Sequence, residues 1–308
     1  MIWFAPSIER LAQRHDFEAL ARAALHRQSE VRRRAVRALG SIGDERIFEP
    51  LGRATSDPDP AVRFEALRVL GELKDSRGCI ALRAALGAGD RATRCAALSA
   101  LAVLGDPRNA AAAAALLEDP AAEVRAAALE TLLRLNHVEA RMLEPLVELV
   151  ESATDPELVQ LAARLLGRLR DPRANASLCR ALPGAPRAVC GAIAWALSQI
   201  GGEDARAALI GALGHADEWV RWQAAGALGD LGDPRAVEPL CFCLEDSHQL
   251  LRNTAALSLV KIGGHQAADA LCRALDASRA HRGLDALTRE AVEQALPVLR
   301  ARRPSGPA

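Results

Sequence analysis

The feature of this 308-residue chain that most restricts its fold is a segment that returns at an almost constant interval. Its clear copies begin at Val31, Val62, Thr93, Val124, Leu158, Val189, Val220 and Leu251. The interval is 31 residues, except for one step of 34 between Val124 and Leu158. A period held this closely is typical of a solenoid, in which each unit packs only against its neighbours.

Each copy has the pattern of two helices. The first copy places apolar residues at helical spacing, namely Val31, Ala35, Val36, Leu39 and Ile42. A turn resembling Gly-Asp-Pro-Arg follows, in which Gly ends one helix and Asp caps the next. Neither helix could bury its apolar stripe alone, so neighbouring units must stack. We therefore expect an all-α solenoid of about eight helix pairs with capping helices at both ends.

The repeat boundaries also predict the organisation of the chain. Residues 1–30 form an incomplete N-terminal capping repeat, and residues 31–276 form the repeat array. Residues 277–300 contain an insertion and a C-terminal capping helix. The last segment, 301–308, has the composition of a disordered tail.

Composition narrows the class of partner. The chain is 50% hydrophobic and 25% charged with a formal net charge of zero, so no bulk field attracts nucleic acid or an acidic membrane. It contains no apolar run long enough to span a membrane. Its seven cysteines include no CxxC pair, which favours reduced thiols and a cytoplasmic location.

The residues of the repeat carry a resemblance to a known family. The run D-x-x-x-x-V-R-x-x-A-x-x-A-L-G-x-x-G-D-P-R is nearly intact at 57–77 and again at 215–235, where His215 replaces the first Asp. It resembles HEAT repeats, specifically the short HEAT-like units of phycobilisome (PBS) lyase subunits, over roughly residues 16–300. The resemblance implies that the helix beginning V-R, called the V-R helix below, lines a concave face.

The resemblance also implies a ladder in which the Arg after Val pairs with an Asp of a turn. The matching arginines are Arg32, Arg63, Arg94, Arg125, Arg221 and Arg252. The matching acids are Asp57, Asp119 and Asp246. Two repeats lack the arginine and carry Val159 and Cys190 instead. We predict weaker coupling between repeats around residues 137–190, and leave open whether the chain bends there.

Positions 2, 6 and 10 of each V-R helix, counted from the opening Val as zero, point away from the stacked core. The N-terminal members of this set are mostly basic, and we select Arg33, Arg37, Phe64 and Arg68. The C-terminal members are aromatic and charged, and we select Trp195, Trp222, Arg164, Arg168, Gly226 and Asp230. Other repeats carry Arg, Ser, Glu, Gln or Asn where these two tryptophans stand, so we expect the tryptophans to be exposed.

A more detailed arrangement follows from the same positions. Gly226 should leave room beside the Trp195 ring, Arg164 could lie over its face, and the rings of Trp195 and Trp222 should come close enough to meet. Trp219 stands just before the opening Val of its repeat, where it either covers the turn or is exposed.

No catalytic or metal constellation emerges. The chain lacks the His-Glu dipeptides of the related deoxyhypusine hydroxylases, and it lacks P-loop, GxGxxG and zinc spacings. His215 and His248 occupy equivalent turns and are interpreted as turn polarity. Cys241 and Cys243 are two apart on a helix and diverge. We expect no catalytic residue, metal or cofactor.

Three functions remain to be weighed. The leading hypothesis is a non-catalytic scaffold that binds another protein or an extended peptide on its concave face. The second is a phycobilin lyase-like protein that holds a tetrapyrrole, whose propionates would need Arg164 or Arg168. The third is an enzyme resembling the HEAT-like DNA glycosylases, in which Trp195, Trp222, Arg168 and Asp230 would act. Zero net charge weighs against the third.

Overall fold

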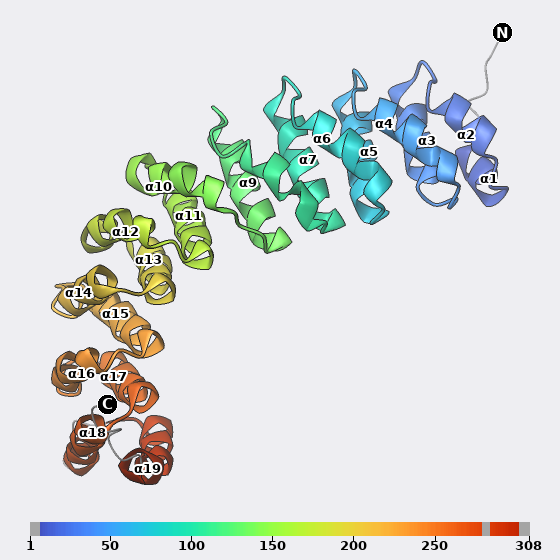
Figure 1. Cartoon of the computed structure of the whole chain (residues 1–308). Coiled ribbons are helices and arrows are strands. Elements are labelled where there is room, and N and C mark those ends of the chain that lie inside the picture. The colour runs from blue at the N-terminus through green and yellow to red at the C-terminus, as the bar shows by residue number, and fades with distance from the viewer. Residues whose placement is uncertain (1–6, 279–283, 302–308) are drawn as a thin grey trace, which may run out of the picture. The chain divides into compact units, whose positions relative to one another are not determined.

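A computed structural model describes residues 7–278 and 284–301 of the chain. Within these ranges every regular element is a helix, as the repeat pattern predicts (Figure 1). The chain divides into two compact units, Met1–Val138 and Glu139–Ala308. In the part of the chain that the structure describes, no helix is long and apolar enough to cross a membrane.

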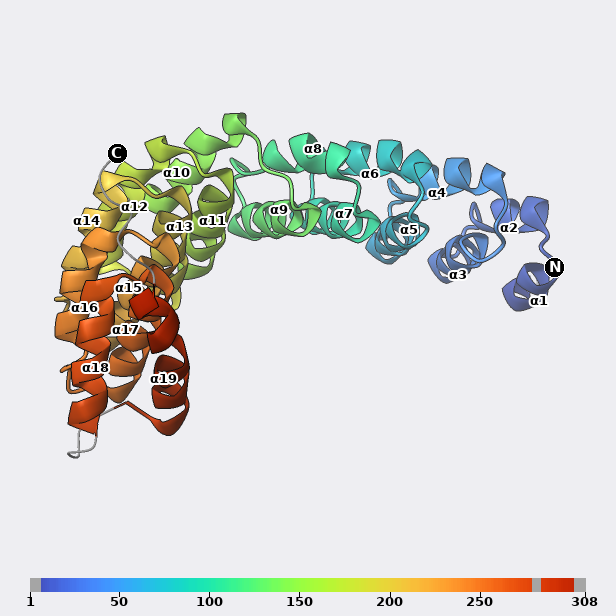
Figure 2. The same cartoon turned by 60° about the horizontal axis from the view of Figure 1, so that its bottom comes forward.

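The first unit consists of two rows of helices, which Figure 2 shows as two layers. The V-R helices form one row, with α1 at its start: α1 (Ile8–Gln13), α3 (Ser29–Leu39), α5 (Pro60–Glu72), α7 (Arg91–Leu104) and α9 (Ala122–Leu135). Shorter helices form the second row: α2 (Phe17–Ala23), α4 (Phe48–Ala54), α6 (Cys79–Ala85) and α8 (Ala110–Ala114).

The second unit repeats this plan. Its V-R row consists of α11 (Pro156–Leu169), α13 (Arg187–Ile200), α15 (Glu218–Leu231), α17 (Gln249–Ile262) and the final helix α19 (Ala286–Ala301). Its second row consists of α10 (Leu143–Ser152), α12 (Asn175–Ala181), α14 (Glu203–Ala212), α16 (Val237–Cys243) and α18 (His265–Ser278). Figure 1 shows the two rows of this unit on opposite sides of it.

Local sequence signals explain where the helices begin and end. Asp59 and Asp217 each accept a hydrogen bond from a backbone N–H in the first turn of a V-R helix, which satisfies a donor that the helix leaves unpaired. Gly232 ends α15 with a φ of 70°, a left-handed conformation that glycine adopts without strain. The Asp of the Gly-Asp-Pro-Arg turn, such as Asp233, caps a short 3₁₀ turn that leads into the second-row helix.

The core lies between the two rows and between successive repeats. In α5, Val62, Ala66, Leu67 and Leu70 are fully buried, and each buried leucine contributes about 1.5–3 kcal/mol. The leucine that recurs in the second-row helix is also fully buried in six repeats: Leu51, Leu82, Leu178, Leu209, Leu240 and Leu271. The apolar spacing of the sequence therefore specifies the stacking surface.

Both ends of the chain fall partly outside the described residues. Residues 302–308 of the expected tail lie outside the described residues, as do residues 279–283 of the expected insertion. The final helix begins at Ala286 and contains Pro297.

Candidate functional site

The arginine after the opening Val ties neighbouring turns together. Arg32 donates from Nε and Nη2 to the carboxylate of Asp57, both at 2.7 Å, and from Nη1 to the backbone carbonyl of His26 at 2.8 Å. One guanidinium thus binds its own turn and the turn of the next repeat. Because the planar fork matches a carboxylate in two places, the contact fixes both distance and orientation.

Other repeats use the same arrangement. Arg94 binds Asp119 at 2.8 and 2.9 Å, and Arg221 approaches Asp246 at 3.3 Å. Burial of Asp119 would raise its pKa, but hydrogen bonds from Arg94 and from the Ala121 N–H outweigh burial and lower the pKa. We call each such Arg–Asp contact between adjacent turns a rung.

The remaining matching arginines make different contacts. Arg63 has Ala88 where the acid would stand, so it binds Thr93 at 2.9 Å and Asp90 at 3.3 Å instead. Arg125 donates to the backbone carbonyls of its own turn, at Asp119 and Pro120. Arg252 does the same at Asp246 and Ser247.

Two repeats of the second unit lack the rung arginine. Val159 and Gly184 stand where an Arg and its Asp would be, and they line a pocket of about 300 Å³ whose walls are mostly apolar. Cys190, which stands at the position of the second missing arginine, is buried. Instead Arg187, at the start of α13, binds Asp217 at 2.8 Å and lowers its pKa by this hydrogen bond. Comparing only the residue after the opening Val of each repeat does not reveal this role of Arg187.

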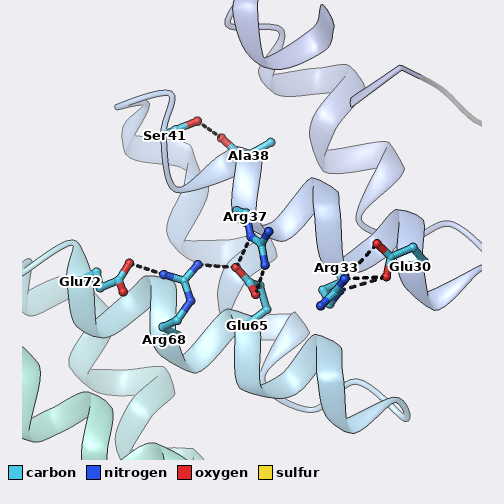
Figure 3. A network of polar contacts seen from close by, with 8 residues as sticks. All are labelled: Glu30, Arg33, Arg37, Ala38, Ser41, Glu65, Arg68 and Glu72. Atoms are coloured by element: carbon cyan, nitrogen blue, oxygen red, sulfur yellow. Dashed lines mark hydrogen bonds and ion pairs between the residues drawn. The ribbon is translucent and has the colours of Figure 1, made fainter. Parts of the chain in front are cut away.

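The basic residues predicted on the V-R row of the first unit are all paired with acids. Arg33 binds Glu30, and Arg37 donates to both oxygens of Glu65 at 2.8 and 2.9 Å. Arg68 binds Glu65 and Glu72 (Figure 3). The basic surface expected from the sequence is therefore neutralised by carboxylates on the same row.

Glu65 is the centre of this network, as Figure 3 shows. Its side chain is only 8% exposed. The hydrogen bond from Arg37, with a further one from Arg68, outweighs the opposing effect of burial and lowers the pKa of Glu65 to about 2. Phe64 lies beside it in the chain and is 37% exposed.

The second unit carries a pocket of about 500 Å³ over the V-R helix α13. Three successive V-R helices contribute to it, and we call it the α13 pocket. Its lining residues are Gln160, Arg164 and Arg168 of α11, Arg187, Ala188, Gly191, Ala192 and Trp195 of α13, and Trp219 and Gln223 of α15. The pocket brings together Arg164, Arg168 and Trp195 of the predicted set. Trp222, Gly226 and Asp230 are not among its lining residues.

Trp195 is half-buried, and its surroundings differ from those expected. A Cβ added at Gly167 would lie 2.6 Å from Cζ3 of the Trp195 ring, so this glycine leaves the space for the indole. A Cβ added at Gly226 would have Thr254 as its neighbour at 3.7 Å. The expected role of Gly226 beside Trp195 is therefore wrong. The ring packs toward the preceding repeat, where Gly167 lies.

The tryptophan rings also meet in a different pair. Trp219 and Trp222 contact edge to face, with ring centroids 4.5 Å apart. The Trp219 indole N–H donates to the carbonyl of Arg187 at 3.1 Å, and that of Trp222 donates to Thr254 Oγ1 at 2.7 Å. The contact expected between the rings of Trp195 and Trp222 is replaced by this pair. Residues three apart on a helix are neighbours, which is the signal that predicts it.

The charged residues selected in the second unit occupy two environments. Arg164 and Arg168 are exposed and line the α13 pocket. The cation–π contacts of the described residues join Arg46 to Phe17 and Arg77 to Phe48, so Arg164 does not take the place expected over Trp195. Asp230 is exposed and binds Lys261 at 2.7 Å.

The histidines and cysteines give no metal centre in the part of the chain that the structure describes. His215 lies near the carbonyl of Pro183 at 3.2 Å and accepts from the Asp217 N–H at 3.0 Å, which is a role in the turn. Burial raises the pKa of the Cys243 thiol to about 11, so this thiol is not activated.

Two stacked rows of helix pairs with a regular period define an α-solenoid. The chain belongs to the HEAT-repeat family: the family model described as HEAT repeats matches residues 17–102, 53–133, 81–159, 143–217 and 208–297. The match establishes the general family, and the phycobilisome lyase type stays a prediction.

Solved structures with the same fold include an engineered protein, with 21% identity and a TM-score of 0.55 over 92% of this chain and 88% of that one. A chain from the structure of Kap95p with RanGDP has 14% identity and a TM-score of 0.65 over 95% of this chain and 46% of that one. The karyopherin Kap121p, bound to the extreme C-terminus of the phosphatase Cdc14p, has 14% identity and a TM-score of 0.57 over 93% of this chain and 37% of that one. No curated protein matches the chain.

Proposed function

We propose that this protein is a non-catalytic scaffold that binds a segment of another protein in the α13 pocket. The observation that carries the proposal is the joint lining of one pocket of about 500 Å³ by Trp195, Trp219 and Arg164, from three successive V-R helices. Tryptophan and arginine are the residue types that most often dominate binding energy at protein interfaces. A row of helices presents them along an extended line, which suits an extended segment.

The fold likeness supports a peptide ligand. Kap121p, which shares the fold at low identity, is bound in its solved structure to the extreme C-terminus of another protein. We infer that this chain uses a similar mode, in which a short segment rather than a whole domain enters the pocket.

The other two functions considered from the sequence receive less support. Trp222 and Asp230, which a glycosylase-like site would need beside Trp195 and Arg168, do not line the α13 pocket. The Asp230 carboxylate is bound to Lys261. A tetrapyrrole would require its propionates to meet Arg164 or Arg168, and absorption spectroscopy after incubation with a bilin tests this.

Selection from a random peptide display library tests the scaffold function. We expect selected peptides to bind the wild-type protein and to lose at least about tenfold in affinity against Trp195→Ala, because an interface tryptophan commonly contributes more than 1.4 kcal/mol. The matched control is Phe242→Ala, since Phe242 is a 75% exposed aromatic on α16 outside the pocket. Circular dichroism should show both variants helical.

Two results would overturn the proposal. One is a selection that yields no binding peptide. The other is a set of peptides that bind Trp195→Ala and the wild type equally well, because the pocket would then not be the site.

A further inference from the structure

The α13 pocket has an uneven charge. Its lining includes three arginines and no aspartate or glutamate. Arg187 is already balanced by Asp217 at 2.8 Å, and Glu218 adds negative charge beside it. The uncompensated positive charge of the pocket is therefore at its α11 side, where Arg164 lies. Arg164 is exposed, and no described residue forms an ion pair with it.

This arrangement contrasts with that of the first unit, where Arg37 and Arg68 meet Glu65. Arg164 occupies the same repeat position as Arg37 and Arg68. The corresponding place for the acid, three residues earlier, holds Glu65 in α5 and Leu161 in α11. The carboxylate that satisfies the guanidinium in the first unit is therefore missing from α11.

One indole donor is also left for a ligand. The N–H groups of Trp219 and Trp222 are used in hydrogen bonds to Arg187 and Thr254. The Trp195 N–H has no hydrogen-bond acceptor among the residues that the structure describes. Its Cε3–Cζ3 edge packs at Gly167, and the indole nitrogen lies across the ring from that edge. A carbonyl or carboxylate oxygen of a ligand can accept from it.

The floor and sides of the pocket suit a peptide backbone. Ala188 and Ala192 are small, so a chain can approach α13 closely beside them. Gln160 on α11 and Gln223 on α15 stand on the two sides, and the Gln223 amide lies over Gly191, within 3.2 Å of an added Cβ. A primary amide offers both a donor and an acceptor, as a peptide group requires.

We propose that the α13 pocket selects an extended peptide with a central Asp or Glu next to an apolar side chain. The carboxylate binds Arg164 on the α11 side, and the apolar side chain packs against Trp195 and Trp219. The proposal rests on the scaffold function and adds the chemistry of the segment that is bound. A nucleic acid fits less well, because phosphate binding needs a long basic stripe and the chain has a formal net charge of zero.

The test uses the full chain and defined probes. The peptides enriched by selection are synthesised with a fluorescent label, in pairs that differ only by Glu→Gln or Asp→Asn at the acidic position. Fluorescence anisotropy then gives the affinity of each pair for the wild type, Arg164→Gln and the matched control Arg108→Gln. Arg108 is a 77% exposed arginine that binds Asp106 outside the pocket. A labelled 20-nucleotide oligothymidine serves as the nucleic-acid probe.

We expect the wild type and Arg108→Gln to prefer the acidic peptide about tenfold, which corresponds to about 1.4 kcal/mol for one charge-assisted hydrogen-bonded contact. Arg164→Gln should reduce this preference to about twofold while still binding the neutral peptide. Enrichment of neutral or basic peptides that still require Trp195 would overturn the acidic preference and leave the scaffold function standing. The same preference in Arg164→Gln as in the wild type would also overturn it. Tighter binding of the oligonucleotide than of any peptide, with a steep salt dependence, would reject the peptide altogether.

Discussion

The two units differ in how they use the arginines at equivalent repeat positions. In the first unit Arg32 and Arg94 complete rungs between turns, and Arg37 and Arg68 share the carboxylate of Glu65. In the second unit Arg187 replaces the rung arginine absent at Cys190, whereas the rung absent at Val159 has no substitute in the described part of the chain. Arg164 of this unit lines a pocket without an acid. An arginine that is satisfied within the fold contributes to stability, whereas one without an internal carboxylate is available for a partner.

The comparison also teaches where repeat proteins can vary without losing their fold. Core positions such as Leu67 and Leu166 are fully buried in both units. The differences lie at positions that contribute to the free face of the V-R row or to the turns. Function can therefore change from repeat to repeat while the stacking surface stays the same.

Removing a rung from the first unit should have the largest effect on stability. Arg94→Ala should lower the free energy of unfolding by about 2–3 kcal/mol, because Asp119, only 5% exposed at its side chain, loses its partner. The control Arg108→Ala removes an exposed arginine of the same repeat and should have little effect. Urea denaturation checks the global value, and hydrogen exchange in α7 and α9 checks the local one. Equal stability of the two variants would contradict a structural role for the rung.

The second prediction concerns the space that Gly167 leaves for the Trp195 ring. Gly167→Ala should cost about 2 kcal/mol, because the added Cβ would meet the ring at 2.6 Å and the backbone of Ala196 at 2.9 Å. Gly226→Ala should instead raise stability by about 0.5–1 kcal/mol, since its helix position has room for a methyl group. Thermal and urea unfolding of the two variants measures this difference. A larger loss of stability for Gly226→Ala than for Gly167→Ala would support the position beside Trp195 that the sequence predicted for Gly226.

A pH titration tests how much the ionised carboxylate of Glu65 stabilises the first unit. The pKa of Glu65 is about 2 in the folded protein and about 4.5 ordinarily. Its contribution is therefore fully present above pH 4.5 and is lost as the pH falls from about 4.5 toward 2. Glu65→Gln should cost about 1–2 kcal/mol near neutral pH and much less near pH 2. A difference between the two proteins that stays constant over this range would show that the ionised carboxylate is not the cause.

The smallest expected effect comes from grafting a rung onto the second unit. The double substitution Val159→Arg and Gly184→Asp restores the spacing of 25 residues seen between Arg32 and Asp57. An added Cβ at Gly184 meets no atom within 4 Å, so the acid has room. A double-mutant cycle should give a favourable coupling of about 0.5–1 kcal/mol. Slower hydrogen exchange in α11 and α13 should accompany it, and additive single effects would count against the graft.

The expectation of weaker coupling around residues 137–190 is tested by the same exchange measurements. The boundary between the two compact units, at Val138 and Glu139, falls at the start of this segment. Uniform protection across all repeats of the wild type would contradict the expectation.

Helix order and stacking residues could be predicted from the sequence, because apolar spacing and turn chemistry are local properties. The partners of the charged side chains could be predicted only in part. Glu65 and Glu72 lie three residues before and four after Arg68 and face it on one helix, which is a readable signal. The contact between Arg187 and Asp217 joins residues 30 apart and depends on how the turns stack.

The site shows the same division between local and distant information. Comparison among repeats predicted that Trp195 and Trp222 are exposed, whereas both are half-buried in the structure. The direction of the Trp195 ring depends on the space at Gly167, in the preceding repeat. Side-chain direction is a packing outcome among three helices, so spacing within one helix could not supply it.

The rungs have a mechanical consequence. Each one joins a turn to the turn of the next repeat by an ionic contact. Under a stretching load the rungs would distribute the force among neighbouring repeats. Between Val159 and Gly184 the ionic contact is replaced by a small, mostly apolar pocket, so we expect the repeats to separate more easily there. Pulling the chain from its two ends should therefore open the second unit before the first.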